Sequence, residues 1–358
     1  MIKSTRYIAF SSALFRYVLA VVVCLIFIDS ASASQLRSPW DFAPAPAMGN
    51  VGTQESRCPS APKLSANLST HGVYADKAGS VVDASKKKSY RRDTASFRAA
   101  AEKIVELADA YRITGDTSAA LCAAQWLNEL ALDNALGGAM KGIQSHFVQA
   151  WMLNAYATAW LKVRPAIDSN RGIHRRINKW LEQLASSVMM FNDKRGSVNN
   201  LRYWAGLAVM NAGIAADNRE AFNWAVQSFN IGIMQIQPDG SLPREMKRAS
   251  LARHYHMYAA GPLVIMAELG EANGLNLYKK EGYALSRLVK FIIRGVDDPS
   301  IYEKISKAKQ RPLTAKSLDF LWLPTYARRF PDKDFERILS KFPRSTKFTR
   351  VTFGGLLP

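Results

Sequence analysis

The strongest constraint on the fold is a helical period of apolar residues that begins after Thr94 and continues along most of the chain. In its first segment the apolar residues are spaced by three and four positions, which places them on one face of a helix. A Gly115-Asp116-Thr117 break then supplies a helix stop and an N-cap for the next helix. Similar helices are predicted at 119–136, 143–163, 173–191, 202–216, 219–237, 251–272 and 277–295.

Short connectors join these predicted helices, among them Ala216-Asp217-Asn218 and Gln237-Pro238-Asp239-Gly240. Short links make antiparallel neighbours, and the helices outnumber those of a simple four-helix bundle. Few stretches alternate with period two, so little or no sheet is expected. We therefore predict an all-α fold over residues 63–358, an (α/α) toroid of antiparallel helix hairpins. An α-solenoid is the competing architecture, but no fixed-period repeat supports it.

The N-terminus is typical of an export signal. Cations precede an apolar run at 17–28, and an Ala-x-Ala site follows, with the cut expected after Ala33. The run is about a dozen residues, whereas a membrane-spanning helix needs ~20, so an uncut anchor is the weaker alternative. We predict a signal peptide at 1–33, a periplasmic or secreted protein without stable membrane insertion, and a monomer.

An irregular arm is predicted at 34–62, where Pro, Ala, Gly and Ser are frequent and no periodicity is seen. Two cysteines remain after cleavage, Cys58 and Cys122. In an oxidising compartment they suggest one disulfide, which would hold the arm on the helical body. Two unpaired buried thiols are the alternative.

The formal net charge of +19 at pH 7 favours polyanionic partners, because it raises their local concentration near the surface. Export disfavours nucleic acid. Acidic glycans, phospholipid headgroups and anionic envelope polymers remain. The basic run at 86–92, taken alone, is typical of a solvated face.

Two polar segments interrupt the apolar helical background, at 197–206 and 242–258. Seven residues separate Arg248 from Tyr255, which on a continuous helix puts both on one face. A guanidinium there could stabilise a phenolate, which otherwise forms near pH 10. Such a tyrosine can take a proton and later return it. A core tyrosine with a satisfied hydroxyl is the alternative interpretation.

Several short motifs, in their order along the chain, carry a family resemblance. They are Cys58-Pro59, Asp76-Lys77-Ala78-Gly79-Ser80, Cys122-Ala123-Ala124-Gln125-Trp126, Asn199-Asn200 followed by Tyr203-Trp204-Ala205, and Lys247-Arg248 followed by Tyr255-His256 and Tyr258-Ala259. Each motif is weak alone, but their shared order is fairly specific. On these residues the chain resembles the alginate lyases that depolymerise polymannuronate by β-elimination, from Cys58 to about Pro324.

The resemblance implies a lyase acting on an acidic polysaccharide, and it implies roles for particular residues. The C5 proton of a uronate becomes acidic only if the charge of the adjacent carboxylate is quenched as the carbanion forms. By similarity, Asn200 would hydrogen-bond that carboxylate. Tyr255 would abstract the C5 proton, protonate the departing O4, or do both, while Arg248 lowers its pKa and holds the sugar. Lys77 would reach the carbohydrate from the N-terminal side.

One position departs from the family pattern. A catalytic histidine follows the Asn-Asn pair in the family, and here that position is Leu201. Leucine can neither donate to a carboxylate nor move a proton. His254 or Arg202 could compensate, although a structural histidine and a surface arginine are the plainer interpretations. The loss of this histidine narrows the range of uronates that the protein cleaves, or it marks a protein that binds acidic glycan without cleaving it.

The remaining substrate-binding candidates are polar or aromatic residues of the matched segments. Aromatic faces cover the apolar side of a sugar ring, whereas Trp126 and Trp151 are expected in the core. No cofactor is expected, since no cluster has metal-ligand spacing. A hydrolase would need two catalytic carboxylates, and Asp239 and Glu245 are the only nearby candidates. The substrate-binding candidates are Lys77, Arg202, Tyr203, Trp204, His256 and Tyr258.

Overall fold

The computed structural model describes residue 1 and residues 35–46, 58–77, 79–167, 170–313, 320–342 and 347–358. Residues Leu36–Pro358 form one unit, and every element named below belongs to it. The predicted signal peptide at 1–33 lies outside the described residues, apart from Met1. Of the predicted irregular arm, the structure describes 35–46 and 58–62, where only one short 3-10 turn forms.

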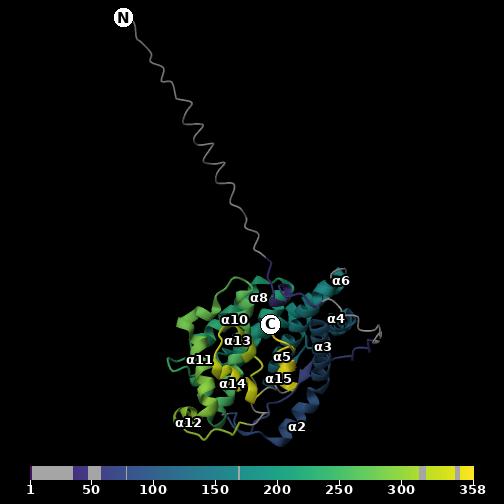
Figure 1. Ribbon diagram of the computed structural model, residues 1–358. Coiled ribbons are helices and arrows are strands. Elements are labelled where there is room, and N and C mark those ends of the chain that lie inside the picture. The colour runs from purple at the N-terminus through teal and green to yellow at the C-terminus, as the bar shows by residue number, and fades with distance from the viewer. Residues whose placement is uncertain (2–34, 47–57, 78, 168–169, 314–319, 343–346) are drawn as a thin grey trace. The chain divides into compact units, whose positions relative to one another are not determined.

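Helices make up almost all of the regular structure (Figure 1). The α-helices are α2 (Ala84–Asp93), α3 (Ala95–Thr114), α4 (Thr117–Leu132), α5 (Ile143–Val163), α6 (Arg171–Arg195), α7 (Asn200–Ala216), α8 (Arg219–Ile233), α9 (Pro243–Met246), α10 (Ala252–Glu271), α11 (Lys280–Asp297), α12 (Ser300–Ser306), α13 (Leu323–Arg329), α14 (Lys333–Lys341) and α15 (Lys347–Thr352). The 3-10 turns are η1 (Pro39–Asp41), η2 (Arg164–Ile167), η3 (Ala249–Leu251) and η4 (Leu277–Lys279). Two short strands, β1 (Leu68–Ser69) and β2 (Met140–Lys141), pair in parallel.

Local sequence signals set the helix ends. The side chains of Asp116 and Asn218 cap the first backbone amides of α4 and α8. Such caps satisfy amides that have no partner inside the helix. Gly115 and Gly196 end α3 and α6 in the left-handed conformation, where glycine is the residue with the least steric cost.

The helices form two layers. Helices α5 and α7 are buried on nearly every side, from Val148 to Val163 and from Arg202 to Ala215. Helix α7 packs against α5, α6, α8 and α10, and α5 also packs against α3. Helices α6, α8 and α11 bury one face only, as outer helices do. The chain is therefore an all-α protein with the (α/α) toroid fold that the helical period predicted.

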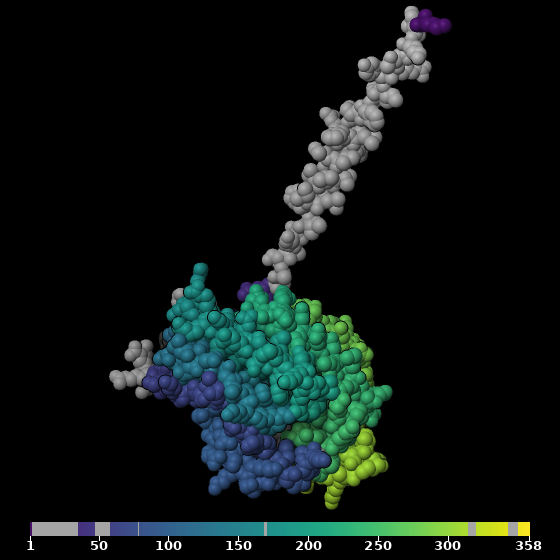
Figure 2. Space-filling model, turned by 180° about the vertical axis from the view of Figure 1, so that it is seen from behind, coloured from purple at the N-terminus to yellow at the C-terminus, as the bar shows by residue number. Residues whose placement is uncertain are grey.

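Figures 1 and 2 place α2 and α12 at the same end of this unit, and α6 lies away from them in Figure 1. Helix α2 was missed by the sequence prediction, because none of its residues is buried and it has no apolar period. The predicted helix over 251–272 begins one residue later, at Ala252. None of the helices in the described part of the chain is long and apolar enough to cross a membrane.

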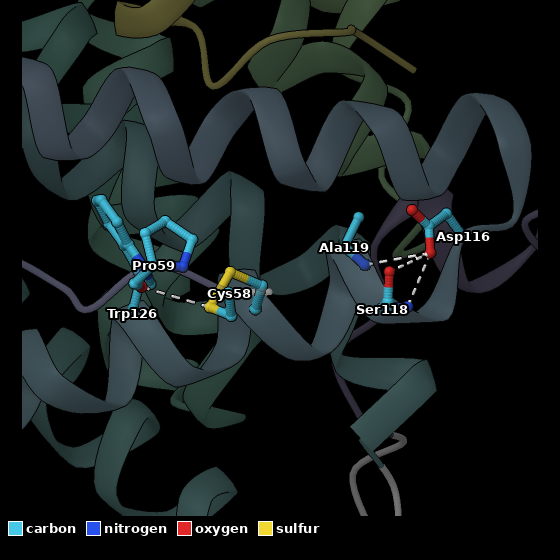
Figure 3. The surroundings of a disulfide bond; sticks show 7 residues. Cys58, Pro59, Asp116, Ser118, Ala119 and Trp126 are labelled. Atoms are coloured by element: carbon cyan, nitrogen blue, oxygen red, sulfur yellow. Dashed lines mark hydrogen bonds between the residues drawn. A yellow bond between two sulfur atoms is a disulfide. The ribbon is translucent and has the colours of Figure 1, made fainter. Parts of the chain in front are cut away.

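A disulfide joins Cys58 to Cys122 in α4, closing a separation of 64 residues (Figure 3). Beside it, the indole of Trp126 donates a hydrogen bond to the carbonyl of Pro59 at 2.8 Å. Closing a loop of this size removes entropy from the unfolded chain and contributes about 4 kcal/mol in the chain-entropy model. The end of the arm is thereby held on the helical body.

Candidate active site

Tyr255, in the first turn of α10, lies at the centre of the site. Its side chain is 9% exposed, and its hydroxyl lies 2.6 Å from the hydroxyl of Tyr74. The guanidinium carbon of Arg248 stands 3.7 Å from the centre of the Tyr255 ring and 5.4 Å from that of Tyr74. A cation over two phenol faces is an attractive arrangement. The predicted meeting of Arg248 and Tyr255 is therefore present.

The route by which these two residues meet differs from the prediction. A continuous helix from Arg248 to Tyr255 was expected, and this is wrong. Helix α9 ends at Met246, η3 follows, and α10 begins only at Ala252. Ala249 has a φ of +49°, which no α-helix contains. The guanidinium of Arg248 therefore reaches the face of the Tyr255 ring across a bend in the backbone at Ala249.

A loop at 73–83, described here except for residue 78, covers Tyr255 through the contact of Tyr74 with its hydroxyl. The loop is pinched by a backbone bridge between Tyr74 and Val82. The Asp76 carboxylate accepts from the Val81 amide at 2.7 Å and from the amide and hydroxyl of Ser80. These donors, the Val81 amide first, lower the pKa of Asp76 to about 2. The Asp76 carboxylate is therefore ionised at neutral pH and can accept all of these hydrogen bonds.

Two arginines fasten this loop to the body of the protein. Arg248 donates to the carbonyl of Gly79 at 2.7 Å, and Arg311 donates to the carbonyl of Ser80. Arg311 is itself held by the hydrogen bond from its amide to the carbonyl of Ser250 at 3.0 Å. The guanidinium of Arg248 thus contacts both the catalytic candidate and its cover.

Asn200, the first residue of α7, is held by a buried carboxylate. Its backbone amide donates to Oε1 of Glu245 at 3.0 Å, and its Nδ2 donates to Oε2 at 2.7 Å. Asn200 is 2% exposed and Glu245 is 1% exposed. Burial raises the pKa of Glu245, while the two bonds from Asn200 and the charge of Arg248 act in the opposite direction.

Two buried polar atoms of this neighbourhood have no hydrogen-bond partner among the described residues, Oδ1 of Asn200 and Nε of Arg248. Buried polar atoms are normally satisfied, so each exception calls for an explanation. One atom is an acceptor and the other a donor. Asn200 Oδ1 could accept a hydrogen bond from a ligand, and Arg248 Nε could donate one to it.

Burial raises the pKa of Tyr255 above its ordinary value, and the neighbouring Tyr74 acts in the same direction. The charge of Arg248 lowers it, as expected from the sequence, but does not outweigh burial. Glu245 adds a smaller contribution that also raises this pKa. In the arrangement seen here, Tyr255 is a neutral phenol at pH 7.

A cavity of about 500 Å³ opens beside Tyr74, and Tyr255 adjoins it through its contacts with Tyr74 and His254. His254 lies on its wall, with its ring 5.1 Å from that of Tyr255 and edge-on to it. The cavity has cationic walls on several sides, from α2, from the start of α10 and from the segment at 311–313. Its lining residues are Tyr74, Val82, Lys87, Ser250, Leu251, Arg253, His254, Arg311, Pro312 and Leu313.

Some predicted substrate-binding residues are engaged elsewhere. Arg202 is 5% exposed, donates to Asp193 and Ser228 at 2.7 Å each, and lies 3.8 Å from the ring centre of Trp224. The alternative interpretation, a surface arginine, is wrong. The guanidinium has structural partners on α6 and α8, so the proposed function does not depend on Arg202.

His256 is fully buried and holds the chain between α9 and α10. Its Nδ1 donates to the carbonyl of Ala252 at 2.8 Å, and its Nε2 accepts from the amide of Leu242 at 2.9 Å. Burial lowers its pKa to about 4, so the imidazole is neutral at pH 7. These bonds favour a structural role over a substrate contact.

The remaining predicted residues differ in how far they are exposed to solvent. Tyr203 and Trp204 are core residues at 1% and 2% exposure, whereas Tyr258 is partly exposed and packs against Trp204 at 5.0 Å between ring centres. Lys77 is exposed on the covering loop. Leu201 is partly buried against the hydrophobic core.

Sequence reasoning missed three residues of the site: Tyr74, Arg311 and the role of Glu245. Tyr74 stands two residues before a recognised motif, which was the only signal for it. Glu245 was weighed only as a hydrolase carboxylate. Its companion Asp239 accepts from the Ser241 amide at 2.8 Å, as a turn residue does. Over the described part of the chain, no group of three or more His, Cys, Asp or Glu side chains could hold a metal ion.

Comparisons with known proteins place this toroid among the polysaccharide lyases. The sequence model of the alginate lyase family matches residues 52–302. A polysaccharide lyase of Stenotrophomonas maltophilia is 38% identical over 77% of this chain and 82% of its own length. An alginate lyase of Pseudomonas putida is 30% identical over 76% and 77%. The chain belongs to the alginate lyase family.

Solved structures show the same fold. Alginate lyase A1-III complexed with tetrasaccharide superposes with a TM-score of 0.72 at 22% identity, over 91% of this chain and 92% of that one. Alginate lyase A1-III from Sphingomonas species A1 superposes with a TM-score of 0.68 at 21% identity, over the same shares of the two chains. At this identity the likeness supports the toroid fold and nothing finer.

Proposed function

We propose that the chain cleaves alginate or a similar polyuronate by β-elimination, with Tyr255 as the proton-transfer group. The observation that carries the proposal is the pair of unsatisfied buried atoms, Asn200 Oδ1 and Arg248 Nε, in the neighbourhood of a phenol that Arg248 covers. A uronate has the carboxylate and hydroxyl groups that such a site would bind. The names of the relatives support this substrate class.

In the proposed reaction, Arg248 and the second N–H of the Asn200 amide neutralise the uronate carboxylate as negative charge develops. Preorganised hydrogen-bond donors of this kind make the largest contribution to the rate enhancement of many enzymes. The phenolate of Tyr255 takes the C5 proton, the C4–C5 double bond forms, and the C4–O4 bond breaks. The same hydroxyl then gives the proton to O4, which restores the phenolate.

The covering loop has a direct bearing on this reaction. The hydroxyl of Tyr74 is hydrogen-bonded to the hydroxyl of Tyr255. A sugar that binds the Tyr255 hydroxyl must therefore replace Tyr74 as its hydrogen-bond partner. Burial and Tyr74 raise the pKa of Tyr255, so losing that contact favours the phenolate. Substrate binding and activation of the base are thus coupled.

Leu201 limits which uronates are handled. With no imidazole at this position, charge neutralisation depends on Asn200 and Arg248 alone. The leucine at position 201 is also the observation that supports a second candidate function, glycan binding without cleavage. We further propose that the chain is exported, as its N-terminal signal pattern and the Cys58–Cys122 disulfide favour.

The experiment is incubation of the purified protein with polymannuronate, polyguluronate and polyglucuronate, following the ultraviolet absorbance of an unsaturated uronate. We expect an increase on at least one polymer. Leu201→His should raise the rate on polymannuronate if the missing imidazole limits it. Measurable affinity without any absorbance increase on the three polymers would favour the binding protein instead.

A further inference from the structure

Helix α2 is a cationic surface outside the catalytic cavity. Its ten residues contain five lysines and arginines and one carboxylate, and none of its residues is buried. Arg92 pairs with Asp93 at 3.0 Å. For Lys87, Lys88 and Arg91, no ion-pair partner exists within the described ranges of the chain. These three charges are therefore exposed and uncompensated.

One face of α2 joins two cavities. Lys87 and Arg91 are four residues apart, so they are neighbours on one side of the helix. Lys87 lines the 500 Å³ cavity beside Tyr74 and His254. Arg91 lines a second cavity of about 340 Å³, whose other lining residues include Arg98 and the carboxylate Glu102, both of α3. The cationic face of α2 therefore lies between the cavity beside Tyr74 and a second depression of mixed charge.

The position of α2 is fixed relative to the covering loop. Asp83 caps its first turn by accepting from the Lys86 amide at 2.9 Å, and the Lys86 side chain donates to the carbonyl of Tyr74 at 3.2 Å. Figure 2 shows the blue surface of α2 and α3 at the same end of the unit as the yellow-green segment near 300–313. Helix α2 is therefore held beside the covering loop, and its Lys87 lines the cavity next to Tyr74.

We propose that the exposed cations of α2, Lys87, Lys88 and Arg91, form a second polyanion-binding site, which holds the uronate residues of the polymer beyond those bound at Tyr255. This rests on the proposed function for its ligand. A repeating carboxylate on every sugar matches a row of uncompensated cations, and a chain too short to leave the cavity gains nothing from them. The enzyme therefore favours long chains.

The test is the double variant Lys88→Ala/Arg91→Ala, because neither residue lines the catalytic cavity. We expect KM for the polymer to rise about 3- to 10-fold, the range of two exposed charge contacts. KM for a tetrasaccharide should stay within about twofold, and the salt dependence of the polymer KM should weaken. The matched control, Arg175→Ala/Lys179→Ala, removes two exposed charges from α6.

The same variants in a Tyr255→Phe background separate this proposal from the catalytic one. Polymer affinity, measured by affinity electrophoresis in polyuronate gels, should fall with the α2 charges and not with the α6 charges. This holds even if no polymer is cleaved. Equal losses for the α2 and α6 variants, equal effects on polymer and tetrasaccharide, or no change in polymer binding would each overturn the second site.

Discussion

Glu245 shows how a single buried carboxylate organises the site. It binds Asn200 through two acceptors and lies close enough to Arg248 and Tyr255 to influence charge on both. A buried carboxylate is stable only when it is well hydrogen-bonded. The fixed orientation of the Asn200 amide follows from this. We interpret Glu245 as a positioning residue for Asn200.

Glu245→Gln tests that interpretation. Glutamine has one acceptor where two are needed, so one bond to Asn200 is lost and its amide is released. We expect kcat to fall about 10- to 100-fold, because a misplaced catalytic group lowers the rate by about this factor. Removing the charge also lowers the pKa of Tyr255, because Glu245 raises it. The limb of the pH–rate profile in which activity increases as the base ionises should therefore shift to lower pH.

A melting temperature close to that of the unsubstituted protein is the control for folding of Glu245→Gln. Unchanged kcat together with an unshifted pH–rate profile would rule out the positioning role. A merely structural carboxylate would alter stability without moving the pH dependence.

At the residue scale, the sequence predicted which residues meet at the site better than it predicted how deeply the other candidates are buried. The meeting of Arg248 with Tyr255 was predicted, since both belong to one motif of the family resemblance. The burial of Arg202 and His256 was not, because polar residues on buried helices are satisfied by partners that are distant in sequence, such as Ser228 and Leu242. Such pairings depend on helix packing.

Among the elements, the loop at 73–83 contributes most to the state of the site. Gly79 has a φ of +63°, and a Cβ there would lie 2.6 Å from Nη2 of Arg248. The glycine therefore allows the guanidinium to approach the loop and still cover Tyr255. Any side chain at this position must displace either the loop or the arginine.

Gly79→Ala should lower kcat/KM by about 10-fold or more, through displacement of Arg248. Steady-state kinetics on the preferred polymer would measure it. Gly72→Ala is the matched control, because a Cβ at Gly72 meets nothing within 4 Å, and activity should be unchanged. Full activity in Gly79→Ala would mean that the contact between Arg248 and the loop has no part in catalysis.

Element prediction succeeded for the long helices with many buried apolar residues. Helices α3 to α8, α10 and α11 were predicted on this signal, and the shorter helices α12 to α15 were not. Helix α2 escaped because it buries nothing, and the break at Ala249 escaped because no glycine or proline marks it. A left-handed alanine is a tertiary effect, which the local sequence does not signal.

For the whole molecule, the (α/α) toroid follows from the number of helices and their short links. The inner helices α5 and α7 supply a rigid core, and the site lies where the ends of α7 and α10 meet the covering loop. The net charge of +19 suits a polyanionic substrate over the whole surface. Long-range attraction and the local site therefore favour the same class of ligand.

The account depends most on Tyr255 as the group that moves the proton. The direct measurement is the rate of unsaturated-uronate formation by Tyr255→Phe on whichever polymer the unsubstituted protein cleaves, with circular dichroism to verify the fold. We predict loss of activity to the background rate with the helical spectrum retained. Full activity in a folded Tyr255→Phe protein would contradict the proposed mechanism.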